Sequence, residues 1–327
     1  MMRLRPHLGF AVPQLRVSPG RGAVLLLCAL VLGACRPNDP DLNRMQPSRD
    51  FETTWLAGVE VSGDVLQQGF ESYTLYCYAC HGHMGDGAGP AAPGLRPPPR
   101  DFRQATYKFG WVTDGLPHDD DLRRIIEEGL HGTAMLKWDI PPGDLDAIVQ
   151  YIKLFAIEDW ADPDALGEQV ALSADPWTDK HDEALVRGSD VYHAVATCQQ
   201  CHPAYVTMEE VEQVARAEGR TPTTRPNPFY PELKESQYEV DGRQVKVMPP
   251  DFLYHPVRVS HELDEVYKTI GAGIAGTAMP AWKGSLAEDD LWALSYYVKY
   301  LIDMRDTAEA ESLRRKLFAS EAAASSF

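Results

Sequence analysis

The stretch "CYACHGHMGDG" at residues 77–87 and the shorter stretch "CQQCH" at residues 198–202 decide how this chain is interpreted. Each contains two cysteines separated by two residues, with a histidine directly after the second cysteine. The chain has 327 residues but only six cysteines, and four of the six lie in these two motifs. A separation of two residues holds both thiols on one side of a short turn and places the histidine beside them.

The spacing C-x-x-C-H is the attachment signature of c-type haem. In that chemistry the two thiols add to the vinyl groups of the porphyrin and the histidine ligates the iron. Because the motif occurs twice, the sequence predicts two sites of covalent haem attachment.

Three other interpretations of the cysteine pairs fit less well. A redox dithiol of the thioredoxin type has no use for the histidine and belongs near a βαβ pattern, which is not found here. A four-cysteine zinc site has the right ligand count, but the two pairs lie much farther apart in the sequence than those of a zinc ribbon. Two disulfides would close very small loops and constrain little of the unfolded chain.

The N-terminus indicates export. Residues 1–22 contain four arginines and no acidic residue, and the apolar run "AVLLLCALVLGAC" follows. This is typical of a secretory signal, and the run is short for a membrane span. Its end, "LGAC" at Cys35, resembles the lipobox of bacterial lipoproteins, which implies a signal peptide over residues 1–34 and lipidation of Cys35. An uncleaved anchor helix is the alternative; either would tether the protein to the periplasmic face of a bacterial membrane, inner or outer.

Composition constrains the partners. Residues 35–61 begin with a polar, proline-bearing stretch and are predicted to be a lipidated stalk. The chain has 31 basic and 48 acidic residues, a net charge of −17, which argues against nucleic acid as a partner. Redox proteins with basic docking faces fit this charge. An acidic surface that only keeps the protein soluble is the alternative.

An internal repeat organises the rest of the chain. "IEEGLHGTAMLKW" at residues 126–138 matches "IGAGIAGTAMPAW" at residues 270–282. Upstream, "PPPRDF" ending at Phe102 matches "MPPDF" ending at Phe252, and downstream "LDAIVQYIKLF" matches "LWALSYYVKYL". The order is the same in both halves, so the sequence predicts a duplicated domain.

Apolar periodicity and acidic first turns predict helices in both halves, at residues 64–80, 119–130, 142–156 and 287–303. Residues 82–100 are rich in glycine and proline and are expected to form an irregular loop. A single small β-hairpin is predicted at residues 238–247, with its turn at Asp241 and Gly242. The expected fold class is all-α, with two tandem small helical domains.

Each half also offers a sixth iron ligand at the same place in the repeat, Met135 or Met279. A thioether is a soft donor that suits haem iron, and His/Met ligation raises the reduction potential. A methionine that merely fills a core gap is the alternative, but the repeat ties each methionine to its own cysteine motif. His131 could in principle replace Met135; its counterpart is Ala275, so the repeat does not require it.

Both halves resemble class I c-type cytochrome domains, over residues 62–157 and 184–304. That resemblance implies a fold in which the first and last helices cross beside the haem, with Gly69 and Tyr73 packing at the first crossing and Gly188 and Tyr192 at the second. It also implies two covalently bound haem c groups. The implied ligands are Cys77, Cys80, His81 and Met135 for the first haem, and Cys198, Cys201, His202 and Met279 for the second.

The second half departs from the family pattern. In the first half, Pro90 resembles the family proline whose carbonyl orients the proximal histidine. The second half lacks the glycine-rich stretch that contains it and carries instead an insertion at about residues 205–247. Residues 158–183 are predicted to be an acidic linker that lets the domains pack or swing, and residues 305–327 a charged tail.

These features predict an exported, lipid-anchored dihaem cytochrome c that transfers single electrons between respiratory or periplasmic partners. With both axial positions filled, neither iron has a vacant site for substrate, so an electron carrier is expected rather than an enzyme. Two alternatives stay open: an obligate electron-transfer subunit of a larger membrane oxidoreductase complex, and a dihaem enzyme of the peroxidase or thiosulfate-oxidising type.

Overall fold

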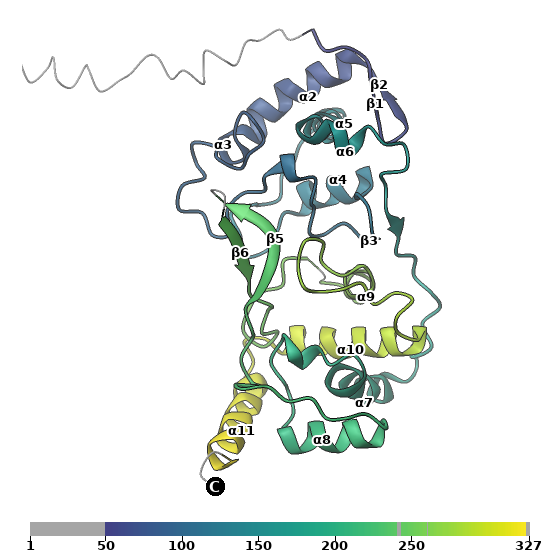
Figure 1. The fold of residues 1–327 in the computed structure, drawn as a ribbon, viewed down its shortest axis with the longest axis vertical. Helices are drawn as coiled ribbons and strands as arrows, with labels where there is room; N and C mark the ends of the chain where they lie inside the picture. Colours follow the sequence, from purple (N-terminus) through teal and green to yellow (C-terminus); the bar gives the residue numbers. More distant parts are fainter. Residues whose placement is uncertain (1–49, 241–242, 260, 325–327) are drawn as a thin grey trace, which may run out of the picture. The chain divides into compact units, whose positions relative to one another are not determined.

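A computed structural model of the chain describes residues 50–240, 243–259 and 261–324 (Figure 1). The predicted signal peptide and the lipidation site at Cys35 lie outside these residues. Residues Ser48–Phe327 form one compact unit. Helices dominate it, and the strands found in the described ranges form three two-stranded sheets, so the predicted all-α class is confirmed. Within the same ranges no helix has the length and hydrophobicity needed to cross a membrane.

The first half is a helical domain preceded by a hairpin. Its elements are β1 (Thr54–Leu56), β2 (Val59–Val61), α2 (Gly63–Tyr76), α3 (Tyr78–His81), η1 (Phe102–Gln104), β3 (Val112–Thr113), α4 (Asp119–Glu128), α5 (Pro142–Lys153), η2 (Leu154–Ala156) and α6 (Ile157–Trp160). Ser62 caps the N-terminus of α2, since its side chain accepts a hydrogen bond from the Val65 amide. Pro142 occupies the first turn of α5, where a missing amide hydrogen costs nothing.

The helices α2 and α5 cross closely, as the resemblance implied (Figure 1). A Cβ atom at Gly69 would lie 2.7 Å from the Cβ of Tyr151 and closer still to the carbonyl oxygen of Ala147. Only glycine therefore permits this approach. Beside it, the rings of Tyr73 and Tyr151 pack with their centroids 5.3 Å apart.

The second half repeats this crossing with α7 and α10. Its elements are β4 (Glu168–Gln169), α7 (His181–Asp190), η3 (Val191–Val195), η4 (Cys198–Gln200), α8 (Met208–Ala217), β5 (Lys234–Val240), β6 (Arg243–Val247), α9 (Leu263–Ala272), α10 (Glu288–Met304) and α11 (Ala308–Ala324). A Cβ at Gly188 would lie 2.6 Å from the Cβ of Tyr297, and Tyr192 packs on Tyr297 at 5.6 Å. The same glycine and aromatic pair therefore build both halves.

Cys198 follows Gly188 by ten residues, whereas Cys77 follows Gly69 by eight, and this longer spacing has a local explanation. The segment η3 is a turn of π-helix, and Thr197 after it has a left-handed backbone with φ of 52°. A π turn inserts an extra residue into a helix without breaking it. The second cysteine motif therefore follows its crossing glycine at a greater distance in sequence.

The predicted β-hairpin is confirmed. Strands β5 and β6 pair antiparallel with Glu239 opposite Gln244, and the predicted turn residues lie outside the described ranges. The rest of the insertion contains α8, which begins with Thr207 and Glu210 in a capping box.

The stalk predicted over residues 35–61 is wrong at its C-terminal end. Residues 54–61 form the antiparallel hairpin β1–β2, and Leu56 and Val61 are buried in the first core. The alternation of "TWLAGVEV" buries one face of this hairpin, and Ala57 and Gly58 supply the positive φ angles of its turn. The folded part therefore begins before residue 62.

The linker is packed. Strand β4 pairs with β3 of the first half, and the Val170 amide donates to the Trp111 carbonyl at 2.8 Å. Val170 itself belongs to the core of the second half. The sequence allowed a linker that lets the two domains either pack together or swing apart, and in the structure they are packed together.

Candidate haem-binding sites

The first cysteine motif forms one compact turn at the end of α2. The amides of Cys80 and His81 both donate to the carbonyl of Cys77, at 3.2 and 3.0 Å. Burial raises the pKa of Cys77 to about 12, so this thiol is protonated at neutral pH. A reactive redox dithiol needs a thiolate, so this environment argues against that alternative.

The second motif forms the same turn. The amides of Cys201 and His202 donate to the carbonyl of Cys198, at 3.0 and 2.9 Å. Burial raises the pKa of Cys198 to about 12 as well.

The zinc and disulfide alternatives find no support. All four cysteines in the described part of the chain have free thiols. No three histidine, cysteine, aspartate or glutamate side chains in that part of the chain gather where they could hold a metal ion. Cys77 packs against the first core and Cys198 against the second, so the two cysteine pairs lie in separate places.

In the first half, His81 is oriented by the segment "PPPRDF", which ends at Phe102 and is repeated in the second half as "MPPDF". The Nδ1 atom of His81 lies 3.2 Å from the carbonyl oxygen of Arg100, and the Phe102 ring stacks on the imidazole at 4.6 Å. The prediction that Pro90 supplies this carbonyl is wrong. Arg100 takes the role because the loop at residues 82–100 returns "PRDF" beside the imidazole.

The second half uses the matching motif. The Nδ1 atom of His202 lies 2.9 Å from the carbonyl oxygen of Pro250, and Phe252 stacks on the imidazole at 5.0 Å. The repeat noted in the sequence therefore has a function that sequence reasoning did not assign to it.

Both imidazoles are set up to bind a metal through Nε2. A carbonyl acceptor at Nδ1 fixes the hydrogen there and leaves the lone pair on Nε2. Burial lowers the pKa of His81 and of His202 to about 4, so both are neutral at physiological pH. Neutral imidazole is the form that ligates metal ions.

A buried tyrosine holds the residue after each histidine. The Tyr73 hydroxyl donates to the Gly82 carbonyl at 2.7 Å, and the Tyr192 hydroxyl donates to the Pro203 carbonyl at 2.9 Å. The sequence assigned these tyrosines to helix packing only. They also connect each helix crossing to its cysteine turn.

Met135 lies on a hydrogen-bonded loop after α4. The Met135 amide donates to the hydroxyl oxygen of Thr133 at 3.0 Å, and that hydroxyl donates to the Leu130 carbonyl at 2.7 Å. The Leu130 amide closes the loop on the Met135 carbonyl at 2.7 Å. The methionine is partly buried and packs against the first core.

Met279 lies on an equivalent loop after α9. Its amide donates to Thr277 at 3.2 Å, the Thr277 hydroxyl donates to the Ile274 carbonyl at 2.8 Å, and the Ile274 amide donates to the Met279 carbonyl at 3.1 Å. Met279 packs against the second core. The Gly-Thr-Ala-Met repeat thus encodes one loop geometry twice.

His131 is exposed and lies against the other half. Its ring packs on His261 with centroids 4.1 Å apart, and its amide donates to the Arg258 carbonyl at 3.0 Å. Its contacts connect the two halves, so nothing in the structure favours an exchange with Met135.

Tyr238, on β5, also connects the halves. The Arg100 guanidinium lies 3.9 Å and the Lys108 ammonium 4.4 Å from its ring centroid. Its hydroxyl donates to the carbonyl of Ala275, in the loop that bears Met279. One side chain of the insertion therefore touches the proximal segment of the first site and the methionine loop of the second.

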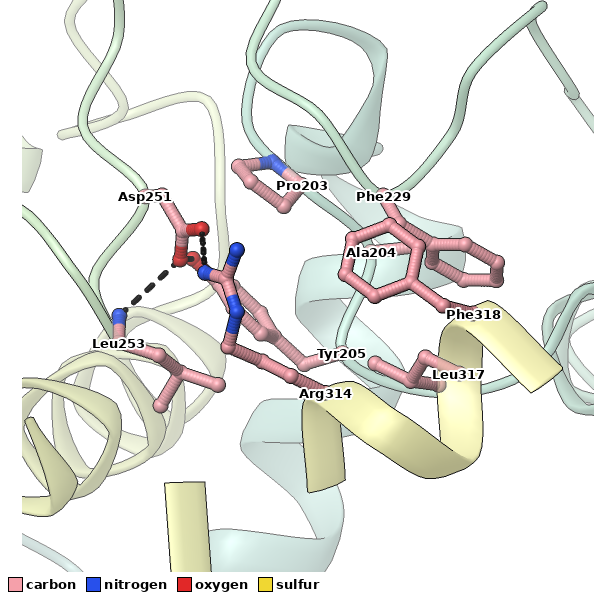
Figure 2. Close-up of a pocket in the computed structure, with 9 residues that line it drawn as sticks. All are labelled: Pro203, Ala204, Tyr205, Phe229, Asp251, Leu253, Arg314, Leu317 and Phe318. Atoms are coloured by element: carbon pink, nitrogen blue, oxygen red, sulfur yellow. Dashed lines mark hydrogen bonds and ion pairs between the residues drawn. The ribbon is translucent and has the colours of Figure 1, made fainter. Parts of the chain in front are cut away.

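Figure 2 shows side chains of the C-terminal helix α11 beside Asp251 and beside the segment Pro203, Ala204 and Tyr205, which follows His202 in the chain. Arg314 forms an ion pair with Asp251, the residue after the Pro250 carbonyl that orients His202. The Asp251 carboxylate is buried and also accepts from the Tyr205 hydroxyl at 3.2 Å and the Leu253 amide at 3.1 Å. The predicted charged tail is thus, up to residue 324, a helix with a structural contact.

Two thiols and a neutral histidine on one turn, present in each half of a helical fold, define a c-type cytochrome. The comparisons agree with this class. The chain belongs to the family described as cytochrome c oxidase, cbb3-type, subunit III, whose profile matches residues 64–152 and 183–298, more than half of the chain. This family implies covalently bound haem c and electron transfer.

A solved structure has a similar fold. It is a chain of the Kuenenia stuttgartiensis reducing HAO-like protein complex Kustc0457/Kustc0458, with 25% sequence identity and a TM-score of 0.54. The match covers 72% of this chain and 96% of that chain. No curated protein sequence shows significant similarity to this chain.

The residues present fit haem c. Each half supplies two unpaired thiols for thioether bonds, a neutral imidazole with its tautomer fixed, and a thioether on a rigid loop. Ligation by His81, Met135, His202 and Met279 stays a prediction.

Proposed function

We propose that this protein is an exported, lipid-anchored dihaem cytochrome c that transfers single electrons between respiratory or periplasmic redox partners. The observation that carries this proposal is the duplication of the whole site. Each half has the same cysteine turn, the same carbonyl on Nδ1 of the histidine, and the same threonine-bonded methionine loop.

Haem c supplies an iron that changes between Fe(III) and Fe(II) as one electron arrives or leaves. The cysteines of the two motifs would hold the porphyrins covalently, and the neutral imidazoles and the methionine sulfurs would ligate the irons. Phe102 and Phe252, stacked on the two imidazoles, keep the proximal sides apolar and exclude water. With a histidine and a methionine ligating each iron, no position would be open to a substrate, so single-electron transfer is the chemistry that the haems would supply.

Contacts between the halves support transfer of electrons within the chain. Arg258 donates to the carbonyls of His131 and Gly132, at 2.9 and 2.8 Å, in the loop that bears Met135. Tyr238 contacts the loop that bears Met279. Since both methionine loops take part in contacts between the halves, the two irons would share one packed interior.

The second candidate function is an obligate electron-transfer subunit of a larger membrane oxidoreductase. Two findings favour it: the family is described as an oxidase subunit, and the solved relative is a chain of a complex. The net charge of −17 suits partners with basic docking faces. Lipid attachment at Cys35 would keep either form at the periplasmic side of a bacterial membrane.

Mass analysis of protein matured in its native host tests the proposal. We expect two porphyrins, one on the peptide with Cys77 and Cys80 and one on the peptide with Cys198 and Cys201, and lipid on Cys35. Ferric spectra should show His/Met ligation at both irons, with one signal lost in Met135→Ala and the other in Met279→Ala. Free thiols at both motifs would contradict the proposal.

Two further measurements separate the alternatives. Stable copurification of other chains from gently solubilised membranes would identify the complex subunit. Turnover of peroxide or thiosulfate by the isolated holoprotein would identify an enzyme and overturn pure electron transfer.

A further inference from the structure

The second cysteine turn is organised around one partly buried guanidinium, that of Arg225. Its Nε donates to the Gln199 carbonyl at 2.7 Å, and one Nη donates to the His202 carbonyl at 2.8 Å. The remaining hydrogens reach three more carbonyls in the segment that follows Arg225: those of Asn227, Pro228 and Tyr230. All five acceptors are neutral backbone oxygens.

The first half closes its turn without a charge. There the backbone amide of Gly87 donates to the His81 carbonyl at 2.9 Å, and the amide of Gly89 donates to the Cys80 carbonyl at 3.2 Å. These amides belong to the glycine-rich loop that the second half lacks. At the corresponding places of the second half, Arg225 takes the His202 carbonyl and the amide of Glu232 takes the Cys201 carbonyl, at 2.9 Å.

No close carboxylate neutralises Arg225. Among the described residues no ion pair includes it, and the nearby Glu232 carboxylate pairs instead with Lys234 at 3.1 Å. A guanidinium stays protonated at every physiological pH, so a full positive charge is fixed one hydrogen bond from the residue that would ligate the second iron. The other charged groups of this region, Asp251 and Arg314, neutralise each other in an ion pair.

We infer that Arg225 is a positioning residue of the second haem site: it replaces the glycine-rich loop in holding the cysteine turn, and its charge raises the reduction potential of that haem. This inference rests on the proposed function, because it requires haem at Cys198 and Cys201. When iron gains an electron, the haem becomes more negative by one unit. A nearby fixed positive charge therefore stabilises the reduced form, and a partly buried charge is screened less than a fully exposed one.

The test is a redox titration of the full dihaem protein, comparing wild type with Arg225→Gln. Glutamine keeps hydrogen-bond donors and removes the charge. We expect the second haem to become about tenfold harder to reduce, equivalent to about 59 mV for one electron. The first haem, which Arg225 does not touch, should titrate as in wild type and serves as an internal reference.

Arg216→Gln is the matched control. Arg216 lies on α8 of the same insertion, its side chain is 71% exposed, and it pairs with Glu212 at 2.9 Å. Exposed charge is screened by water and salt, so this variant should leave both potentials unchanged.

Arg225→Lys separates charge from geometry. A single ammonium keeps the charge but has three hydrogens, too few for five carbonyls. We expect the equilibrium constant for reduction of the second haem to stay within about threefold of its wild-type value. Hydrogen exchange at the amides of Cys201 and His202 should become faster, because the turn is less constrained.

The outcomes are distinguishable. If both haems are attached and Arg225→Gln titrates like wild type, the charge effect is wrong while the proposed function stands. If Arg225→Lys also makes the second haem about tenfold harder to reduce, the proposed charge effect is wrong as well. If Arg225→Gln loses only the second haem, the positioning role is supported and the lysine variant decides the charge effect. Absence of porphyrin from both wild-type motifs would remove the proposed function itself.

Discussion

The two cysteine turns have the same backbone but different support. In the first half, amides of a glycine-rich loop satisfy the carbonyls of Cys80 and His81. In the second half, the loop is replaced by a longer insertion, in which the Arg225 side chain reaches the His202 carbonyl and the Glu232 amide reaches the Cys201 carbonyl. The carbonyls at this turn are therefore satisfied in both halves, and the difference teaches that the donor to the carbonyl after the second cysteine can be either a loop amide or a guanidinium.

The largest effect is expected from a substitution that disrupts the support of the first cysteine turn and leaves the second turn intact. A side chain at Gly89 would meet the carbonyl oxygen of Tyr78 at 2.6 Å and that of Ala79 closer still. Gly89→Val should therefore prevent haem attachment at Cys77 and Cys80. Mass analysis should find one porphyrin per chain instead of two.

The control for that variant is Gly143→Ala, on α5, where the nearest atom to a new Cβ would be 3.8 Å away. It should keep both haems. Retention of the first haem by Gly89→Val would mean that the glycine-rich loop does not support the turn.

The second-largest effect is expected at the glycine helix crossing, which both halves contain. Gly69→Ala and Gly188→Ala each insert a methyl group where neighbouring atoms leave no room, so each should lower the free energy of unfolding by about 3 kcal/mol. Denaturant unfolding measures the loss. Hydrogen exchange should assign it to α2 and α5 in the first variant and to α7 and α10 in the second. Strongly unequal losses would show that the crossings are not equivalent.

A smaller effect is expected when the hydroxyl groups of the two buried tyrosines, Tyr73 and Tyr192, are removed. Tyr73→Phe and Tyr192→Phe remove the hydroxyl donors to the Gly82 and Pro203 carbonyls, at a cost of about 1–3 kcal/mol each. Thermal unfolding of the holoprotein measures it. Tyr230→Phe, at a tyrosine that is 52% exposed, is the matched control and should change little.

The smallest expected effect is a difference in acid stability. Partial burial alone would raise the pKa of Glu288, but hydrogen bonds from Lys283, Tyr267 and Ser173 lower it to about 2. Because the folded pKa is below the ordinary value, this carboxylate stabilises the fold above about pH 4.5. That contribution is lost as the pH falls from 4.5 through 2.

The first half has Pro142 at the corresponding position of its last helix, so it lacks this contribution. Hydrogen exchange as a function of pH should show α10 losing protection in acid, and Glu288→Gln should reduce that dependence. Because the side chain is 44% exposed, the change should be small. A Glu288→Gln protein with the acid sensitivity of wild type would contradict the assignment.

Much of the fold could be predicted from the sequence. The repeat fixed two helical domains, and the glycine and tyrosine of each first helix predicted a close crossing, since only glycine fits there. The hairpin at residues 238–247 followed from alternation around Asp241 and Gly242. The stalk and linker were misjudged, because whether a short polar segment packs depends on distant surfaces, such as the α6 end that meets Ala57.

The features of the candidate site also fall into two groups: those predicted from the sequence and those decided by the tertiary structure. Cysteine spacing, the adjacent histidines and the methionines at equivalent places are local patterns, so the candidate haem ligands and their grouping into two sets are predictions of the sequence alone. The carbonyls of Arg100 and Pro250, the Arg225 guanidinium and the pair of Asp251 with Arg314 were decided by the tertiary structure. Each of these contacts joins residues 19 to 63 positions apart, and only the path of the folded chain brings such atoms within hydrogen-bonding distance.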